Sequence, residues 1–118
     1  MIIFKKFSFD SAHFLPNVAE SHKCRQVHGH TYQLTIYLKG PIDPVTGWVV
    51  DFADIKREAG SVVSLLDHKL LNNIPGLENP TCELVCVWLW NQLKPKLPAL
   101  NRVELYETLT SGAVYVGE

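Results

Sequence analysis

The 118-residue sequence lacks the charge excess and the long apolar runs that would point to several classes of protein. Lys and Arg number 11 against 12 Asp and Glu, and the formal net charge is −1. The basic residues are scattered, so no basic field indicates nucleic acid or an anionic membrane as a partner. No apolar run approaches the roughly 18 residues of a membrane-spanning helix. The lysines of "MIIFKKFSFDSAHF" follow too short an apolar stretch for a signal peptide.

Cysteine is also scarce. The three residues Cys24, Cys82 and Cys86 make an odd count, which does not suit a disulfide framework and favours a reducing compartment. We therefore expect a cytoplasmic protein. Hydrophobic residues make up 47% of the chain and charged residues 19%, which is ordinary for a globular protein. With no repeat or linker, residues 1–118 are expected to form one domain, small for a self-contained catalytic pocket.

Period-two alternation of apolar and polar residues predicts strands near both ends of the chain. Residues 2–12 and the segment "HTYQLTIYLKG" alternate in this way, and "DPVTGW" at 43–48 has the composition of a turn. Two further segments, "NRVELYETL" and "GAVYVGE", are predicted to close the chain as strands joined at Ser111-Gly112.

Helical spacing of apolar residues occurs between these strands. It predicts one helix over residues 52–66, with Asp51 and Asp54 as an N-cap pair, and a second from about Thr81 to Leu93, before Pro95. Cys82 and Cys86 fall in this second helix and are expected to be small core residues. The order of two strands, two helices and two strands predicts an α+β fold with helices packed on an antiparallel sheet.

Four ionisable side chains share the apolar faces of the predicted strands, because residues two apart in a strand point to the same side. These are His13, His28, His30 and Glu107, the last in register with Val103, Leu105 and Leu109. An unpaired charge facing the interior is costly, so each needs a partner. Any one of the histidines could be a hydrogen-bonded core residue, and the glutamate could pair with an arginine. Three imidazoles converging from adjacent strands instead favour zinc, which takes three protein ligands in catalytic sites.

Two further features allow two interpretations each. Cys24 could be a fourth zinc ligand, or a reactive thiol between Lys23 and Arg25, where positive charge favours the thiolate. Asp67 and His68 follow the first predicted helix. The histidine could interact with the helix dipole, or the carboxylate could orient an imidazole that acts as acid or base.

Five segments together resemble the 6-pyruvoyl-tetrahydropterin synthase family, almost end to end. They are "FSFDSAH", "HKCRQVHGHTY", "DPVTGWVVDFADIK", "LLDHKLLNNIPGLENPTCE" and "YETLTSGAVYVGE". Three residues separate Cys24 from His28, as in the bacterial carboxy branch of the family; the animal enzymes have a longer insert there. Cys82 stands where a serine is common.

Carried over position by position, the resemblance implies a role for each of these residues. It makes Cys24 the catalytic base and Glu107 the anchor of a pterin ring, which Thr81 also contacts. The remaining roles are a proton relay through Asp67 and His68, and Zn²⁺ held by His13, His28 and His30. Lys23 and Arg25 are candidates for binding a triphosphate.

The resemblance also implies a fold, an assembly and a reaction. The fold is the tunnelling fold, a four-stranded antiparallel sheet with two helices packed on one side. Subunits join edge to edge into a β-barrel, a homohexamer of two trimers with sites between subunits. The reaction converts 7,8-dihydroneopterin triphosphate to 6-carboxy-5,6,7,8-tetrahydropterin with release of acetaldehyde and triphosphate, in queuosine biosynthesis, with zinc as Lewis acid. The alternatives are pyruvoyl-type activity on the same substrate and a non-catalytic structural zinc module.

Overall fold

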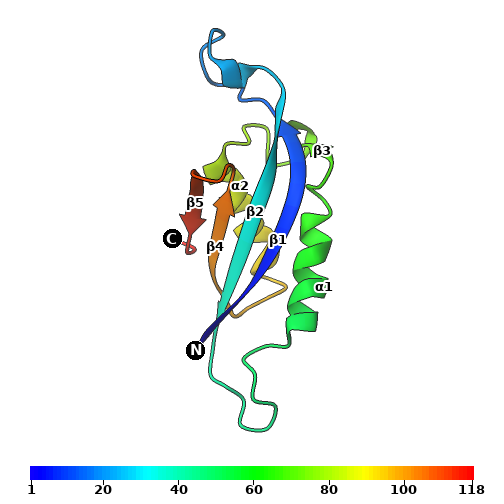
Figure 1. Cartoon of the computed structure of the whole chain (residues 1–118), viewed down its shortest axis with the longest axis vertical. Coiled ribbons are helices and arrows are strands. Elements are labelled where there is room, and N and C mark those ends of the chain that lie inside the picture. Colours follow the sequence, from blue (N-terminus) through cyan, green and yellow to red (C-terminus); the bar gives the residue numbers. More distant parts are fainter.

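Two long strands form the centre of the sheet. The computed structural model describes all 118 residues, and β1 (Ile2–His13) pairs antiparallel with β2 (His28–Lys39) along its full length (Figure 1). The alternation predicted for both strands is confirmed by their burial, which places Tyr32 and every second residue to Leu38 in the core. At the end of the sheet that carries His13 and His28, β1 runs one residue further and β2 two residues further than predicted.

The sheet has five strands in the order β3-β1-β2-β4-β5, which corrects the predicted four-stranded antiparallel sheet. The strands β4 (Leu100–Tyr106) and β5 (Gly112–Tyr115) were expected, whereas β3 (Lys69–Leu70) was not. β3 pairs parallel with β1 at Ser11 and Ala12, so the sheet is mixed. A two-residue strand is too short to show any period, and only its long-range contact with β1 defines it.

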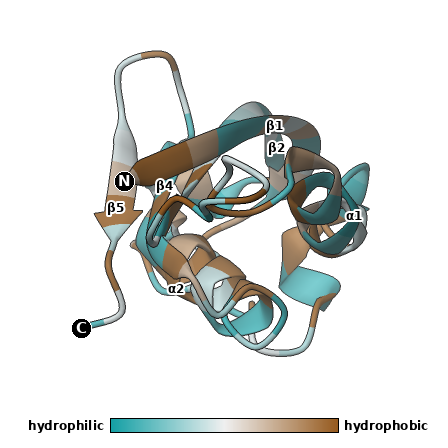
Figure 2. Cartoon of the chain, turned by 90° about the horizontal axis from the view of Figure 1, so that it is seen from below, coloured by the Kyte–Doolittle hydropathy of each residue, from teal (hydrophilic) through white to brown (hydrophobic).

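Two helices of twelve residues pack on the side of the sheet that carries the core, α1 (Phe52–Val63) and α2 (Cys82–Leu93) (Figure 2). The Asp51 carboxylate accepts from the backbone N–H of Ala53 at 2.9 Å, and Thr81 Oγ1 accepts from the N–H of Leu84 at 3.2 Å. The cap predicted at Asp51 is therefore confirmed, and Thr81, predicted only as the approximate start of the second helix, is the N-cap of α2. Neither helix has the length and apolar character needed to cross a bilayer.

A single cluster of 21 buried residues fills the space between helices and sheet. Cys82 and Cys86 belong to it, which confirms their expected place in the core. The other face of β1 and β2 carries the exposed side chains, among them Phe4, Asp10 and Thr31.

The prediction that one strand continues to Leu109 is wrong. β4 ends at Tyr106, and Leu109 is 91% exposed. The chain turns early because the backbone N–H groups of Glu107 and Thr108 both donate to the carbonyl of Ser111. β5 likewise ends at Tyr115, before Gly117 takes a φ of +83°. The turn leaves Glu107 one residue beyond β4, at the end of the sheet where β1 ends and β2 begins.

Candidate active site

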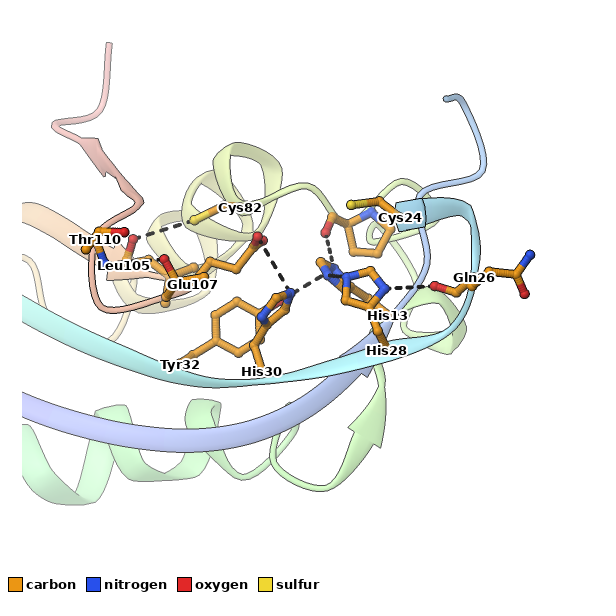
Figure 3. A network of polar contacts seen from close by, with 12 residues as sticks. His13, Cys24, Gln26, His28, His30, Tyr32, Cys82, Leu105, Glu107 and Thr110 are labelled. Atoms are coloured by element: carbon orange, nitrogen blue, oxygen red, sulfur yellow. Dashed lines mark hydrogen bonds and ion pairs between the residues drawn. The ribbon is translucent and has the colours of Figure 1, made fainter. Parts of the chain in front are cut away.

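Three histidines meet where β1 ends and β2 begins. His13 lies opposite His28 in the β1–β2 register, and Ser11 lies opposite His30. The Nε2 atoms of His13 and His28 are 3.0 Å apart, and one ring nitrogen from each of the three histidines lies within 4.8 Å of the others (Figure 3). Two ligands on a tetrahedral zinc ion at its usual Zn–N distance are separated by roughly 3.3 Å. The three rings therefore fit a zinc ion in spacing and ligand type.

The hydrogen bonds of the other ring nitrogens fix the tautomers of two of these histidines. Nδ1 of His13 lies 2.8 Å from the Pro80 carbonyl, and Nδ1 of His28 lies 2.8 Å from the Gln26 carbonyl. A carbonyl oxygen only accepts, so each Nδ1 carries the proton and donates. Both Nε2 atoms then present lone pairs to each other, with no hydrogen between the neutral rings. A cation satisfies both, in the arrangement of metal-bound histidines oriented by backbone carbonyls.

His30 supplies the third nitrogen. Its Nε2 is buried and has no hydrogen-bond partner, and it lies 3.6 Å from the Glu107 Oε1 atom. Burial lowers the pKa of both His13 and His30, and the nearby Glu107 carboxylate opposes part of that shift. A lowered pKa keeps both rings neutral, the form in which imidazole binds metals. A buried nitrogen without a partner is unusual, and a bound ion would account for it.

Glu107 lies between the histidine cluster and a small cavity. The cavity has a volume of about 240 Å³ and is lined by Leu15, Thr81, Cys82, Glu83, Glu107, Ser111 and Gly112. Gly112 is required there because a Cβ atom would lie 2.3 Å from the Leu105 carbonyl oxygen. The Cys82 thiol donates to that same carbonyl, and burial raises its pKa to about 12, so it stays protonated. Glu107 and Thr81, predicted as neighbours in one pocket, do line the same cavity.

Cys24 lies in the excursion between β1 and β2, in the short 3₁₀ turn η1 (Lys23–Arg25). Its side chain is half-buried, and Figure 3 shows it on the same side of the sheet as the histidines. The convergent ligand atoms are those of the three histidines, and the Cys24 sulfur is not among them. This geometry favours three histidine ligands with an open position over a closed four-ligand site.

Asp67 and His68 lie outside the three-histidine cluster. His68 Nδ1 and Asp67 Oδ1 are 3.0 Å apart, and Asp10 holds the pair through its backbone, since its N–H donates to Asp67 and its carbonyl accepts from the N–H of His68. His68 has a φ of +57°, a conformation few non-glycine residues adopt. His68 lines a cavity of about 550 Å³ together with Asp10 and Thr31, and polar atoms of Asp10, Asp67 and His68 lie within 4.8 Å of one another. Asp10 and Thr31 lie on the face of the sheet opposite the histidines. One chain therefore does not bring Asp67 and His68 to Cys24.

Tyr32 is part of the site although the sequence indicated only a core residue. Its hydroxyl lies 3.4 Å from His13 Nδ1, its ring stacks on Phe9, and burial raises its pKa. Its position two residues after His30 was the available signal. The carbonyls of Pro80 and Gln26 gave none, because any residue type supplies a carbonyl.

Comparison with known proteins places the chain in a family. The family described as 6-pyruvoyl tetrahydropterin synthase matches residues 2–118. The chain is 39% identical to the 6-carboxy-5,6,7,8-tetrahydropterin synthase of Synechocystis sp., over 97% of this chain and 92% of that protein. It is 34% identical to the dihydroneopterin monophosphate aldolase of Pyrococcus furiosus, over 89% and 88%. It is also 34% identical to the human 6-pyruvoyl tetrahydrobiopterin synthase, over 97% and 90%.

A solved structure of a family member has the same fold. The 6-pyruvoyl tetrahydropterin synthase of Caenorhabditis elegans superposes with a TM-score of 0.93 at 27% identity, covering 100% of this chain and 96% of that one. Full-length family coverage, relatives above 30% identity and the shared fold lead to one conclusion. The chain belongs to the 6-pyruvoyl tetrahydropterin synthase family.

Proposed function

We propose that this protein is a zinc-dependent lyase that converts 7,8-dihydroneopterin triphosphate to 6-carboxy-5,6,7,8-tetrahydropterin, releasing acetaldehyde and triphosphate, in queuosine biosynthesis. The observation that carries the proposal is the group of three convergent histidine nitrogens beside a cavity lined by a carboxylate. The Synechocystis relative bears the name of this enzyme, and the spacing of Cys24 and His28 is that of the carboxy branch.

The chain would hold zinc through the Nε2 atoms of His13, His28 and His30. When bound, the metal supplies Lewis-acid chemistry at the substrate hydroxyls. Glu107 would accept from the adjacent N–H groups of the 2-amino-4-oxopyrimidine edge, which two carboxylate oxygens can bind together. Its place between the cavity and His30 supports this role, because a pterin ring bound there would lie beside the cluster. Thr81 already caps α2, so it would contact the pterin with the remaining capacity of its hydroxyl.

Cys24 would move protons between the side chain and the ring as a general base. Asp67 and His68 would renew its protonation state from a neighbouring subunit. Their position on the opposite face of the sheet supports this, as does the 78% exposure of the His68 side chain. The sheet also has two open edges, β3 and β5, which could pair with other copies. A homohexamer of two trimers, with the sheets closed into barrels, would pair these open edges. It would also bring Asp67 and His68 of one subunit to Cys24 of another. Three free cysteines support a cytoplasmic location.

Two relatives favour other reactions at the same site. The human relative is a 6-pyruvoyl tetrahydrobiopterin synthase and the Pyrococcus relative a dihydroneopterin monophosphate aldolase. A pyruvoyl-type reaction keeps the three-carbon side chain, whereas an aldolase acting on the monophosphate cleaves it and releases a two-carbon aldehyde that keeps the phosphate. Only the proposed reaction releases acetaldehyde together with triphosphate.

Product analysis decides among these reactions. The zinc-loaded protein is incubated with 7,8-dihydroneopterin triphosphate, and acetaldehyde, triphosphate and the pterin product are quantified. We expect acetaldehyde and triphosphate in equal amounts. Triphosphate without acetaldehyde would indicate the pyruvoyl reaction, and no turnover would leave a structural zinc module. A parallel incubation with 7,8-dihydroneopterin monophosphate tests the third reaction, because release of a phosphorylated two-carbon aldehyde there would indicate an aldolase.

A further inference from the structure

The segment that carries Cys24 has little regular structure of its own. Residues 14–27 extend beyond the end of the sheet (Figure 1), and their one regular element is the turn η1. A few hydrogen bonds hold the segment in place. The Leu15 N–H donates to the Cys24 carbonyl at 2.8 Å, and the Arg25 guanidinium donates to the Val18 carbonyl at 2.9 Å. The position of the thiol therefore depends on a small number of contacts.

His22 makes one of these contacts, directly to Cys24. The backbone N–H of Cys24 donates to His22 Nδ1 at 3.0 Å, so that the imidazole caps the turn η1. Together with the bond from Leu15, this ties both backbone polar groups of Cys24. It is also the one hydrogen bond that the His22 side chain makes.

The tautomer of His22 is fixed by this contact. A backbone N–H can only donate, so Nδ1 of His22 is unprotonated and the ring proton lies on Nε2. His13 and His28 have the opposite arrangement, with the proton on Nδ1 and a free Nε2 facing the proposed metal position. His22 is therefore not a further metal ligand, because its one unprotonated nitrogen, Nδ1, already accepts the hydrogen bond from the Cys24 N–H.

We propose that His22 is a positioning residue for Cys24, whose amide it anchors so that the thiol is held beside the three-histidine cluster. The inference rests on the proposed function for its activity readout. General-base catalysis needs the base within hydrogen-bond reach of the proton it abstracts, and small displacements cost much of the rate. Of the five histidines, His22 is the one for which the proposed reaction has no other role.

Substitution at position 22 separates the anchoring bond from other effects of the imidazole. His22→Ala removes the acceptor. His22→Asn restores it, because Asn Oδ1 is attached to Cγ just as His Nδ1 is, and asparagine is a favoured cap. Ser21→Ala serves as the matched control, since Ser21 is exposed in the same segment and makes no side-chain hydrogen bond. Zinc content and the thermal melt of each variant verify that the cluster and fold are intact.

Steady-state kinetics gives the first readout. A lost anchor should lower kcat of His22→Ala by about 10-fold or more, as expected for a misplaced catalytic group, with KM within about twofold of the parent. His22→Asn should recover to within about threefold and Ser21→Ala should match the parent. An unchanged kcat in His22→Ala would overturn the proposal. So would a His22→Asn protein as slow as His22→Ala, because the imidazole would then act by another route.

Hydrogen exchange of the Cys24 amide, followed by NMR, gives a readout that needs no turnover. The amide should exchange several-fold faster in His22→Ala than in the parent, and His22→Asn should restore its protection. If the parent releases no acetaldehyde, the proposed function fails while these exchange rates still decide the role of His22. Equal exchange of the Cys24 amide in the parent and His22→Ala would overturn the anchoring bond itself.

Discussion

The Nε2 atoms of His13 and His28 face each other at 3.0 Å, while the Nδ1 atom of each ring donates to a backbone carbonyl. Two lone pairs at this distance repel each other unless a cation lies between them. His30 Nε2 is buried without a hydrogen-bond partner. It is the third nitrogen that a bound cation would satisfy. The metal-free chain is thus expected to be less stable than the metal-bound chain at the end of the sheet where the site lies.

Removal of the metal should therefore lower the melting temperature. Zinc at about a hundredfold excess over its dissociation constant should stabilise the fold by roughly 2.7 kcal/mol, because it binds the folded chain and not the unfolded one. The measurement is a thermal melt of protein stripped with a chelator, before and after zinc is restored. The variant His13→Ala is the control and should not respond to zinc. A parent protein whose melt is the same in both states would contradict the site.

Cys24→Ala should retain one zinc per chain and remain folded, yet lose at least about 10²-fold in turnover, the lower end for a general base. The reason is geometric, since the convergent ligand atoms belong to three histidines and the sulfur is not among them. Metal analysis and a thermal melt of the purified variant accompany the rate measurement. A zinc-depleted and destabilised Cys24→Ala protein would show that the cysteine is a ligand of a structural site.

Glu107→Gln should weaken pterin binding by about 1.5–3 kcal/mol, the scale of a hydrogen bond to a charged group. The shape of the side chain is kept and the charge is lost, and zinc content should stay the same. Glu83→Gln is the matched control, because Glu83 lines the same cavity but is exposed at its rim. Titration with a pterin ligand measures both variants. Equal affinity in Glu107→Gln and the parent would assign the anchor to another residue.

Complementation tests whether the relay pair reaches Cys24 from a neighbouring subunit. Cys24→Ala and His68→Ala should each be inactive, and mixed oligomers of the two should recover about a quarter of the parent activity, because a random half of each residue's positions is intact. The double variant, mixed with itself, is the control. Sedimentation should give a multiple of three chains, six in the proposed assembly. A stable active monomer, or no recovery on mixing, would contradict a shared site.

Strand parity explains why part of the site could be predicted from sequence. His13, His28 and His30 fall on the apolar side of alternating segments, and alternation is a geometric property of extended backbone. Counting alternate residues along the last predicted strands also placed Glu107 on the same face as the cluster. That count assumed a strand reaching Leu109, which the chain does not form. The turn that replaces it depends on the Ser111 carbonyl, which is a backbone contact and leaves no pattern in the side chains.

The position of Asp67 and His68 could not be read from sequence for a similar reason. Both are tied to the backbone of Asp10, a residue 57 positions from Asp67, and β3 beside them is too short to alternate. The family resemblance named the pair as partners of Cys24, but the face of the sheet on which they lie follows from the tertiary pairing of β3 with β1.

The β1–β2 hairpin aligns twelve consecutive residue pairs, from Ile2 with Lys39 to His13 with His28. A slip of one residue in that alignment would turn every side chain of one strand to the other face. His13 would then lie on one side of the sheet and His28 and His30 on the other, where they could not share an ion. A metal ion held by all three histidines would therefore stabilise only the native alignment of β1 and β2, and a chain paired one residue out of register could not bind it in this way.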